Sequence, residues 1–158
     1  MSEKTPAIST LTRREIEAGI AGPLIRAFAA EIGEEKARLV AGRVISELAK
    51  KSGEALAQVA GGRGLENFAK GLELWSQDGA LEFEILEQGP KKLSMNVTRC
   101  RYADMYQRIG MSELGFLLSC NRDYAMIEGF NPKIRFSRTQ TLMEGAKHCD
   151  FRYELAAE

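Results

Sequence analysis

The side chains best suited to chemistry are concentrated in the C-terminal part of this chain. All three cysteines and the single histidine follow residue 99, at Cys100, Cys120, His148 and Cys149. A cysteine acts as a nucleophile or metal ligand through its thiolate, and a histidine can transfer protons near neutral pH. The same region contains further polar side chains, at Asp104, Asn121, Arg122, Asp123, Arg138, Gln140, Glu144 and Asp150. We therefore expect the functional site in the C-terminal half.

Cys120, in the stretch LLSCNRDYAMIEGF, is the candidate nucleophile. Asp123 follows three residues later, so on a regular helix the two residues share a face and the carboxylate can act as a base. Arg122 lies two residues away and faces Cys120 only if the chain turns there. The alternative is a buried core thiol, because free cysteine is among the residue types most often buried. Both interpretations stay open from these residues alone.

Two predicted strands near the C-terminus carry the other candidate residues. Adjacent strand residues alternate sides, so Cys149 falls on the apolar face and His148 on the opposite one, where His148 could serve a site at the mouth of the strand. Arg138 falls on the apolar side, where an unpaired guanidinium is costly, and its planar fork suits either a substrate carboxylate or a helix carboxylate. Gln140 shares its face, and Gln140 or Asn121 could donate to developing negative charge.

Metal binding is the alternative use of Cys100, Cys120 and Cys149. Structural zinc normally takes closely spaced pairs such as C-x₂-C, whereas 19 and 28 residues separate these cysteines. No phosphate-binding loop or dinucleotide fingerprint occurs. We therefore predict no metal and no cofactor, with the three thiols as the alternative metal-binding or oxidation-sensing set. A disulfide between two of them depends on geometry that a sequence does not specify.

Composition narrows the class of protein. A length of 158 residues predicts a single domain over residues 1–158, and 44% hydrophobic with 28% charged residues is typical of globular proteins. The 22 basic and 22 acidic residues balance, so nucleic-acid or membrane partners are not expected, and near-neutrality favours a homo-oligomer. The polar N-terminus lacks the apolar core of a signal peptide, which predicts a cytoplasmic protein with reduced thiols.

Residues 10–76 show helical periodicity, and residues 1–9 are expected to be disordered. A first helix is predicted up to Gly33, with Thr12 and Glu15 as a capping box and a kink or break at Pro23. Its apolar residues recur at Ile16, Ile20, Leu24 and Phe28, with Ile25 and Ile32 beside them. A second helix follows, with a predicted buried face of Leu39, Val40, Val44, Ile45 and Leu48, and residues 65–77 form a third. This helical part would cover a sheet or form an oligomer contact.

The period changes to two in residues 79–158. Residues 80–88 and 93–98 alternate around the turn GPKK and predict a hairpin. Residues 101–109 and 112–129 return to helical spacing, and residues 133–142 and 148–155 predict a second strand pair. The expected class is α+β, with N-terminal helices packed on an antiparallel sheet of about four strands and a helical insertion between the two hairpins.

Four motifs occur together between residues 99 and 155: CRYADMY, LG followed by SCNRD, GFNP, and RTQTLMEGAKHCDFRY. Together they resemble the L-2-amino-thiazoline-4-carboxylic acid hydrolase family. A more distant likeness, concerning fold, is to small-ligand-binding domains of the 4-vinyl reductase type. The family resemblance implies hydrolytic opening of a cyclic amidine, a thiazoline with a carboxylate, to a carbamoyl-cysteine. It falls on Cys120, Asn121, Asp123, Arg138, Gln140, Gly145, Cys149 and Asp150.

The predicted function is a metal-independent hydrolase that acts on a C–N or C–S bond of a small cyclic amidine or amide with a carboxylate. Cys120 would attack the electrophilic carbon, and Asp123 or His148 would transfer protons. Substrate contacts would come from Asn121, Arg138, Gln140 and Cys149, with Arg138 on the carboxylate. In a variant of this chemistry, a water held by Asp123 attacks and Cys120 is a bystander. The alternative is a non-catalytic small-ligand- or metal-binding sensor that uses the three cysteines.

Overall fold

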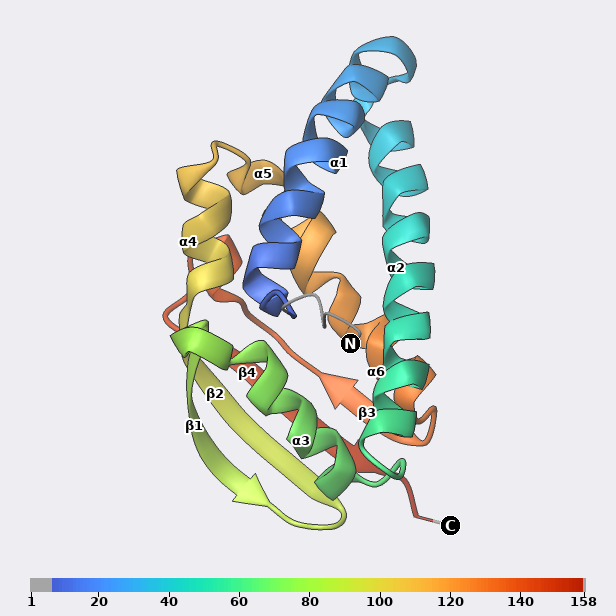
Figure 1. Ribbon diagram of the computed structural model, residues 1–158, viewed down its shortest axis with the longest axis vertical. Helices are drawn as coiled ribbons and strands as arrows, with labels where there is room; N and C mark the ends of the chain where they lie inside the picture. The colour runs from blue at the N-terminus through green and yellow to red at the C-terminus, as the bar shows by residue number, and fades with distance from the viewer. Residues whose placement is uncertain (1–6, 158) are drawn as a thin grey trace, which may run out of the picture.

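A computed structural model describes residues 7–157, in which a four-stranded antiparallel sheet is covered by helices (Figure 1). The predicted α+β architecture is confirmed. Most of the N-terminal segment predicted to be disordered lies outside the described residues. The helices and strands are α1 (Thr10–Ile32), α2 (Glu34–Val59), α3 (Leu65–Trp75), β1 (Leu81–Gln88), β2 (Lys92–Cys100), α4 (Arg101–Arg108), α5 (Ser112–Gly115), α6 (Arg122–Phe130), β3 (Ile134–Ser137) and β4 (Cys149–Leu155), with short turns η1 (Gln77–Gly79), η2 (Phe116–Cys120) and η3 (Leu142–Glu144).

The strands pair in the order β1-β2-β4-β3, so the two predicted hairpins meet where β2 pairs with β4. In this register Val97 lies opposite Cys149. The strand predicted to reach residue 142 ends at Ser137 instead, because the backbone N–H groups of Thr139 and Gln140 donate to the Asp150 carboxylate. The chain therefore leaves the sheet just before Arg138. No helix among residues 7–157 is long and apolar enough to cross a membrane.

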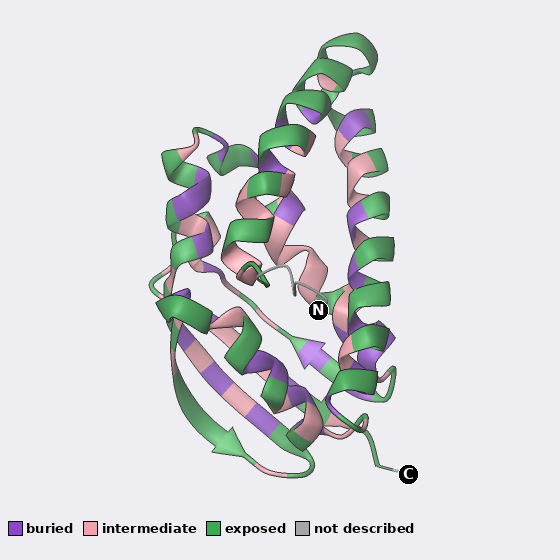
Figure 2. Cartoon of the chain, in the orientation of Figure 1, coloured by how far each residue is buried: buried purple, intermediate pink, exposed green. Residues whose placement is uncertain are grey.

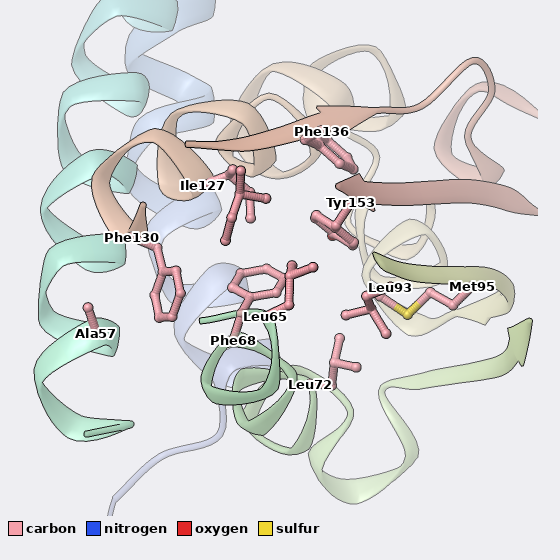
Figure 3. Packing of buried hydrophobic residues seen from close by; sticks show 11 residues of the cluster. Ala57, Leu65, Phe68, Leu72, Leu93, Met95, Ile127, Phe130, Phe136 and Tyr153 are labelled. Atoms are coloured by element: carbon pink, nitrogen blue, oxygen red, sulfur yellow. The ribbon is translucent and has the colours of Figure 1, made fainter. Parts of the chain in front are cut away.

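The main core lies between the sheet and helices α3 and α6 (Figure 3). Phe68 of α3 is fully buried at its centre. Its ring centroid lies 5.3 Å from that of Phe130 and 4.9 Å from that of Tyr153, distances typical of favourable aromatic pairs. Aromatic packing thus ties α3 and α6 to β4, and this fixes the position of the residues that precede Phe130 on α6.

Helix α1 differs from the prediction at its N-terminal cap and at Pro23. Ser9, rather than the Thr12–Glu15 box, caps the helix by accepting a hydrogen bond from the Thr12 N–H. The helix continues through Pro23, where a kink or break was expected. Pro23 and Gly19, whose carbonyl loses its helical donor, both lie at exposed positions. Water can satisfy that carbonyl, which lowers the cost of a proline inside the helix.

The predicted buried face of α2 is wrong. Leu39, Val40, Val44 and Leu48 are 42–64% exposed, and of the five predicted residues Ile45 alone is buried. The face that is buried consists mainly of small residues at four-residue spacing: Ala37, Ile45, Ala49, Gly53 and Ala57. Small side chains allow another helix to approach closely, so α2 crosses α6 with Gly53 at the contact and leaves its larger apolar residues outside.

Two glycines allow the close crossing of α2 and α6. A Cβ atom added to Gly129 would lie 2.0 Å from the carbonyl oxygen of Lys50. A Cβ atom on Gly53 would lie 2.0 Å from the carbonyl oxygen of Met126. Both obstacles are backbone atoms of a helix, which cannot rotate away as a flexible side chain can. The crossing therefore depends on glycine at both positions.

We predict that Gly129→Ala destabilises the fold by about 1–3 kcal/mol or more, because the added methyl group overlaps the backbone of α2. Chemical denaturation measures the free energy of unfolding. The control is Gly19→Ala, since a Cβ atom there meets no atom within 4 Å. This control should be neutral or stabilising, because alanine is a better helix former than glycine. Equal stability of the two variants would contradict the close crossing.

Candidate active site

A cavity of about 120 Å³ lies between the sheet, α3, the start of α1 and the segment that runs from η2 into α6. Most of its wall is apolar or aromatic, with Leu72, Trp75, Leu81, Phe83, Met95, Val97, Met126, Phe151 and Tyr153. Its ionisable or polar lining residues are Thr10, Arg14, Cys100, Tyr102, Ser119, Cys120, Arg122, Asp123, Arg138 and Cys149. An apolar pocket with a few convergent polar groups is the usual form of a small-molecule site.

The three cysteines, far apart in the sequence, line this one cavity. Cys100 ends β2, Cys120 ends η2 and Cys149 begins β4, and all three are free thiols. Burial raises the pKa of Cys100 to about 11, and burial likewise raises the pKa of Cys120 and Cys149. All three thiols are therefore protonated at neutral pH. Across residues 7–157, no three His, Cys, Asp or Glu side chains are grouped so that they could hold a metal ion.

Arg138 is buried at the cavity wall, with 3% of its side chain exposed. Its Nη1 donates to Oδ2 of Asp123, and its Nη2 donates to the carbonyl oxygen of Cys120 at 3.3 Å. The guanidinium carbon also lies 5.5–5.7 Å from the ring centroids of Phe116, Tyr124, Phe136 and Phe151, within the range of cation–π attraction. Of the two partners considered for Arg138, the structure shows the helix carboxylate.

Asp123 is the acidic group of the cavity that titrates closest to neutral pH. Its burial raises the pKa of the carboxyl to about 6, although the charge and hydrogen bond of Arg138 oppose this increase. Burial also raises the pKa of the two lining phenols, to about 12 for Tyr102 and well above its usual value for Tyr153. With the thiols protonated as well, Asp123 is the lining acid that can accept and return a proton near neutral pH.

A π-helical turn explains how neighbouring residues reach the same cavity. The N–H of Asn121 donates to the carbonyl of Phe116, five residues earlier, at 2.8 Å. This wider turn changes the directions in which the side chains after it point, relative to those of a regular helix. Cys120, Arg122 and Asp123 therefore all line the cavity, whereas a regular helix would direct Arg122 away from Cys120. Regular helical spacing alone could not identify Arg122 as a site residue.

No sequence pattern predicted Arg14 as a site residue. It projects from the first turns of α1, far along the chain from the other site residues, and no spacing pattern connects it to them. Its Nη1 lies 2.6 Å from Oε2 of Glu17, and Nη2 of Arg122 lies 3.1 Å from the same oxygen. Two cavity-lining arginines thus share one carboxylate.

Three predicted site residues, Asn121, Gln140 and His148, are not among the residues that line this cavity. The amide of Asn121 lies near Gly42 of α2. Gln140 donates from its side chain to the carbonyl oxygen of His148 at 3.0 Å, so it is engaged in the loop. His148 lies in the bend before β4 and does not join Cys149 at the cavity. Of the two residues predicted to transfer protons, Asp123 is the one that lines the cavity.

Two residues marked by the family motif have structural roles in the loop after β3. Asp150 accepts hydrogen bonds from the N–H groups of Thr139 and Gln140 and from the Thr139 hydroxyl at 2.5 Å. Gly145 adopts φ +92°, a left-handed conformation that favours glycine. Both features hold the loop that carries Arg138.

We predict that the Asp123 carboxyl titrates near pH 6 and that Arg138→Met moves its pKa higher, because the opposing positive charge is lost. Carbon-13 NMR of aspartate-labelled protein measures this pKa. Arg135→Met, an exposed arginine on β3, is the matched control and should leave the pKa unchanged. An Asp123 pKa near 4 in all three proteins would contradict the effect of burial.

The same pKa has a consequence for stability. An unfolded aspartate releases its proton near pH 3.9, whereas folded Asp123 retains it to about 6. The folded state then binds more protons between these values, so the free energy of unfolding contributed by this group decreases as pH rises from about 4 to about 6. Denaturation curves should show this decrease in the wild type and not in Asp123→Asn. Parallel pH dependence of the two proteins would contradict it.

Comparison with known proteins shows a similar fold and a family match. The fold is similar to the crystal structure of the phenol-responsive sensory domain of the transcription activator PoxR with phenol, with a TM-score of 0.52 and 13% identity over 97% of this chain and 77% of that chain. No curated protein matched the sequence. Residues 13–153 match the model of the L-2-amino-thiazoline-4-carboxylic acid hydrolase family. The chain therefore belongs to the L-2-amino-thiazoline-4-carboxylic acid hydrolase family.

Proposed function

We propose that this protein hydrolyses a small cyclic amidine that carries a carboxylate, of the 2-amino-thiazoline-4-carboxylate type, in the cavity beside Asp123. The observation that carries the proposal is a carboxyl group at the cavity wall, paired with a buried arginine and with its pKa raised to about 6 by burial. A general base is most effective when its pKa lies near the working pH. Family membership supports the hydrolytic reaction class.

The cavity suits a small ring compound. Aromatic and apolar side chains such as Trp75, Met95 and Phe151 form most of its wall and can contact the ring atoms and sulfur of a thiazoline. Several of the polar lining groups, Asp123 among them, come from η2, α6 and the residue after β3. A bound ring would therefore present its amidine carbon to Asp123 while its apolar edge contacts the sheet and α3.

In the proposed reaction, ionised Asp123 takes a proton from a water molecule as the water oxygen bonds to the amidine carbon. The C=N electron pair moves to the amidine nitrogen, and the protonated carboxyl gives its proton to that nitrogen. Asp123 then takes the remaining hydroxyl proton as the carbonyl of the carbamoyl product forms and the ring C–N or C–S bond breaks, and it passes this proton to the leaving heteroatom. Arg138 keeps the Asp123 carboxyl in place and stabilises its ionised form.

We assign the attack to water rather than to Cys120. Burial and the neighbouring Asp123 carboxylate raise the pKa of the Cys120 thiol, so no thiolate is present at rest. Attack by Cys120 would first require transfer of the thiol proton to Asp123. Both routes use Asp123 as the base, and they differ in whether the sulfur atom of Cys120 is needed.

We predict that Asp123→Asn lowers kcat for ring opening by about 10²–10⁴-fold, because a general base is lost. Cys120→Ala should retain activity within about tenfold, since a lost wall contact affects fit more than chemistry. Mass spectrometry of the carbamoyl product measures turnover of 2-amino-thiazoline-4-carboxylate. Asp104→Asn, on α4 and away from the cavity wall, is the control for loss of a carboxylate. Loss of activity in both Cys120→Ala and Cys120→Ser, with both variants folded, would assign the attack to the thiol.

Binding of a small ligand without turnover is the second candidate function. It is favoured by the largely apolar cavity and by the fold shared with a sensory domain. Trp75 is the single tryptophan of the chain and lines the cavity, so its fluorescence should report any occupant. A fluorescence change with cyclic amidines or phenol, together with no ring opening, would support binding and overturn the hydrolase proposal.

A further inference from the structure

Three arginines line the cavity, but they pair with two carboxylates. Asp123 pairs with Arg138, and Glu17 is the carboxylate that Arg14 and Arg122 share. Arg14 and Arg122 have only 16% and 11% of their side chains exposed. Glu17 is 41% exposed, so it faces solvent more than either arginine does. One positive charge of this arginine pair is left over at the cavity wall.

The charge of Arg138 is already neutralised by a carboxylate of its own, Asp123. Its side chain donates to Asp123 and Cys120 and is surrounded by four aromatic rings. In contrast, Arg14 and Arg122 share one carboxylate. Among residues 7–157, Arg14 donates to Glu17, and Arg122 donates to Glu17 and to the Leu118 carbonyl. Each of these two guanidiniums therefore keeps further N–H groups for a ligand, because a guanidinium carries five.

We propose that Arg14 and Arg122 form a carboxylate-binding subsite of the cavity and select substrates that carry an anionic group. This inference rests on the proposed function, whose substrate it defines further. A planar guanidinium pair from two different helices can bind both oxygens of a carboxylate. Thr10 and Ser119 also line the cavity and add hydroxyl groups from α1 and η2.

The subsite lies close enough to Asp123 to affect it. The charges of Arg122 and Arg14 both act to lower the pKa of the Asp123 carboxyl, after the larger effect of Arg138. A substrate carboxylate bound between the two arginines would leave the amidine end of a small ring near Asp123. Binding of the carboxylate at one end of the substrate would thus position the reacting carbon at its other end.

The test compares two probes, 2-amino-thiazoline-4-carboxylate and 2-aminothiazoline without the carboxylate. Rapid-mixing fluorescence of Trp75 gives Kd before turnover, and product analysis gives kcat and KM. We expect Arg14→Gln and Arg122→Gln to weaken binding of the carboxylated probe at least tenfold and to leave binding of the other probe within about twofold. Arg13→Gln, an exposed neighbour on α1, should change neither value.

The possible outcomes separate this inference from the proposed function. If the carboxylated probe binds preferentially and this preference depends on both arginines, the subsite is supported. If the wild type nevertheless shows no turnover, the hydrolase proposal is overturned. Turnover by the wild type with equal loss of both probes in the variants, or with no loss, overturns the subsite. Lower melting temperatures with unchanged probe preference would assign the arginines to holding α1 against α6 alone.

A second inference comes from the outer face of α1 and α2, which we call the hairpin face. It consists of nine large apolar residues, each 42–65% exposed: Ile16, Ile20, Leu24, Phe28, Ile32, Leu39, Val40, Val44 and Leu48. From Ala18 to Ala30 the one charged residue of α1 is Arg26, and it pairs with Glu113. Figure 2 shows exposed residues along both helices, and their shared turn projects beyond the rest of the fold.

Between these helices runs a groove of about 370 Å³ whose lining side chains are all apolar, including Leu24, Phe28, Val40 and Val44. Nine half-exposed side chains of this size provide on the order of the ~800 Å² that each partner buries in a standard interface. An exposed apolar surface of this extent marks an interaction site.

We infer that a second copy of this chain covers the hairpin face. A pair of antiparallel helices is suited to a twofold axis, because rotation places the α1–α2 groove of one copy against the matching helices of the other, as in a four-helix bundle. The formal net charge of zero adds no overall repulsion between copies. The residues of the face are apolar on both helices, so the same patch is complementary to itself.

Sedimentation analysis of the full chain between about 1 and 100 μM tests this inference over the range of ordinary interface affinities. We expect a dimer for the wild type and a monomer for Leu24→Glu and Val44→Glu, with unchanged helical circular dichroism. Val59→Glu, an 83% exposed position outside the face, is the control and should remain dimeric. A monomeric wild type throughout this range, or folded dimers of both glutamate variants, would overturn it.

Discussion

The buried ion pair between Asp123 and Arg138 is the interaction on which the site depends. A buried arginine is costly without a partner, and here a helix carboxylate and four aromatic rings offset that cost. The pair also joins α6 to the loop after β3, so it connects the two parts of the chain that form the cavity wall. The same burial that makes the pair necessary brings the carboxyl into the pKa range of a proton-transfer group.

The rest of the fold holds this pair in position. Gly53 and Gly129 let α2 cross α6 at backbone contact, and Phe68 packs α6 and α3 against β4. The π-helical turn before α6 then places Cys120, Arg122 and Asp123 at the cavity wall. Asp150 holds the loop on the other side of the pair by accepting backbone hydrogen bonds. Two packed helices, one irregular turn and one anchored loop thus suffice to place the site.

Much of this could be predicted from the sequence, and the failures have physical causes. Alternation of apolar residues identified the strands, and Arg138, predicted on the apolar side of the third one, is buried although that strand ends at Ser137. The buried face of α2 was missed because alanine and glycine carry little hydrophobic signal, while the larger residues mark an outer face. Arg14 could not be found because only the tertiary fold brings α1 to the cavity. Arg122 was set aside because regular spacing does not anticipate a π-helical turn.

The dependence of ring-opening rate on pH tests most directly whether Asp123 is the base. Single-turnover rates of the wild type with 2-amino-thiazoline-4-carboxylate should rise with an apparent pKa near 6 and level off above it, because only ionised Asp123 accepts the proton. A rate that keeps rising through pH 9, as expected for ionisation of a thiol, or the absence of turnover at every pH, would contradict this role.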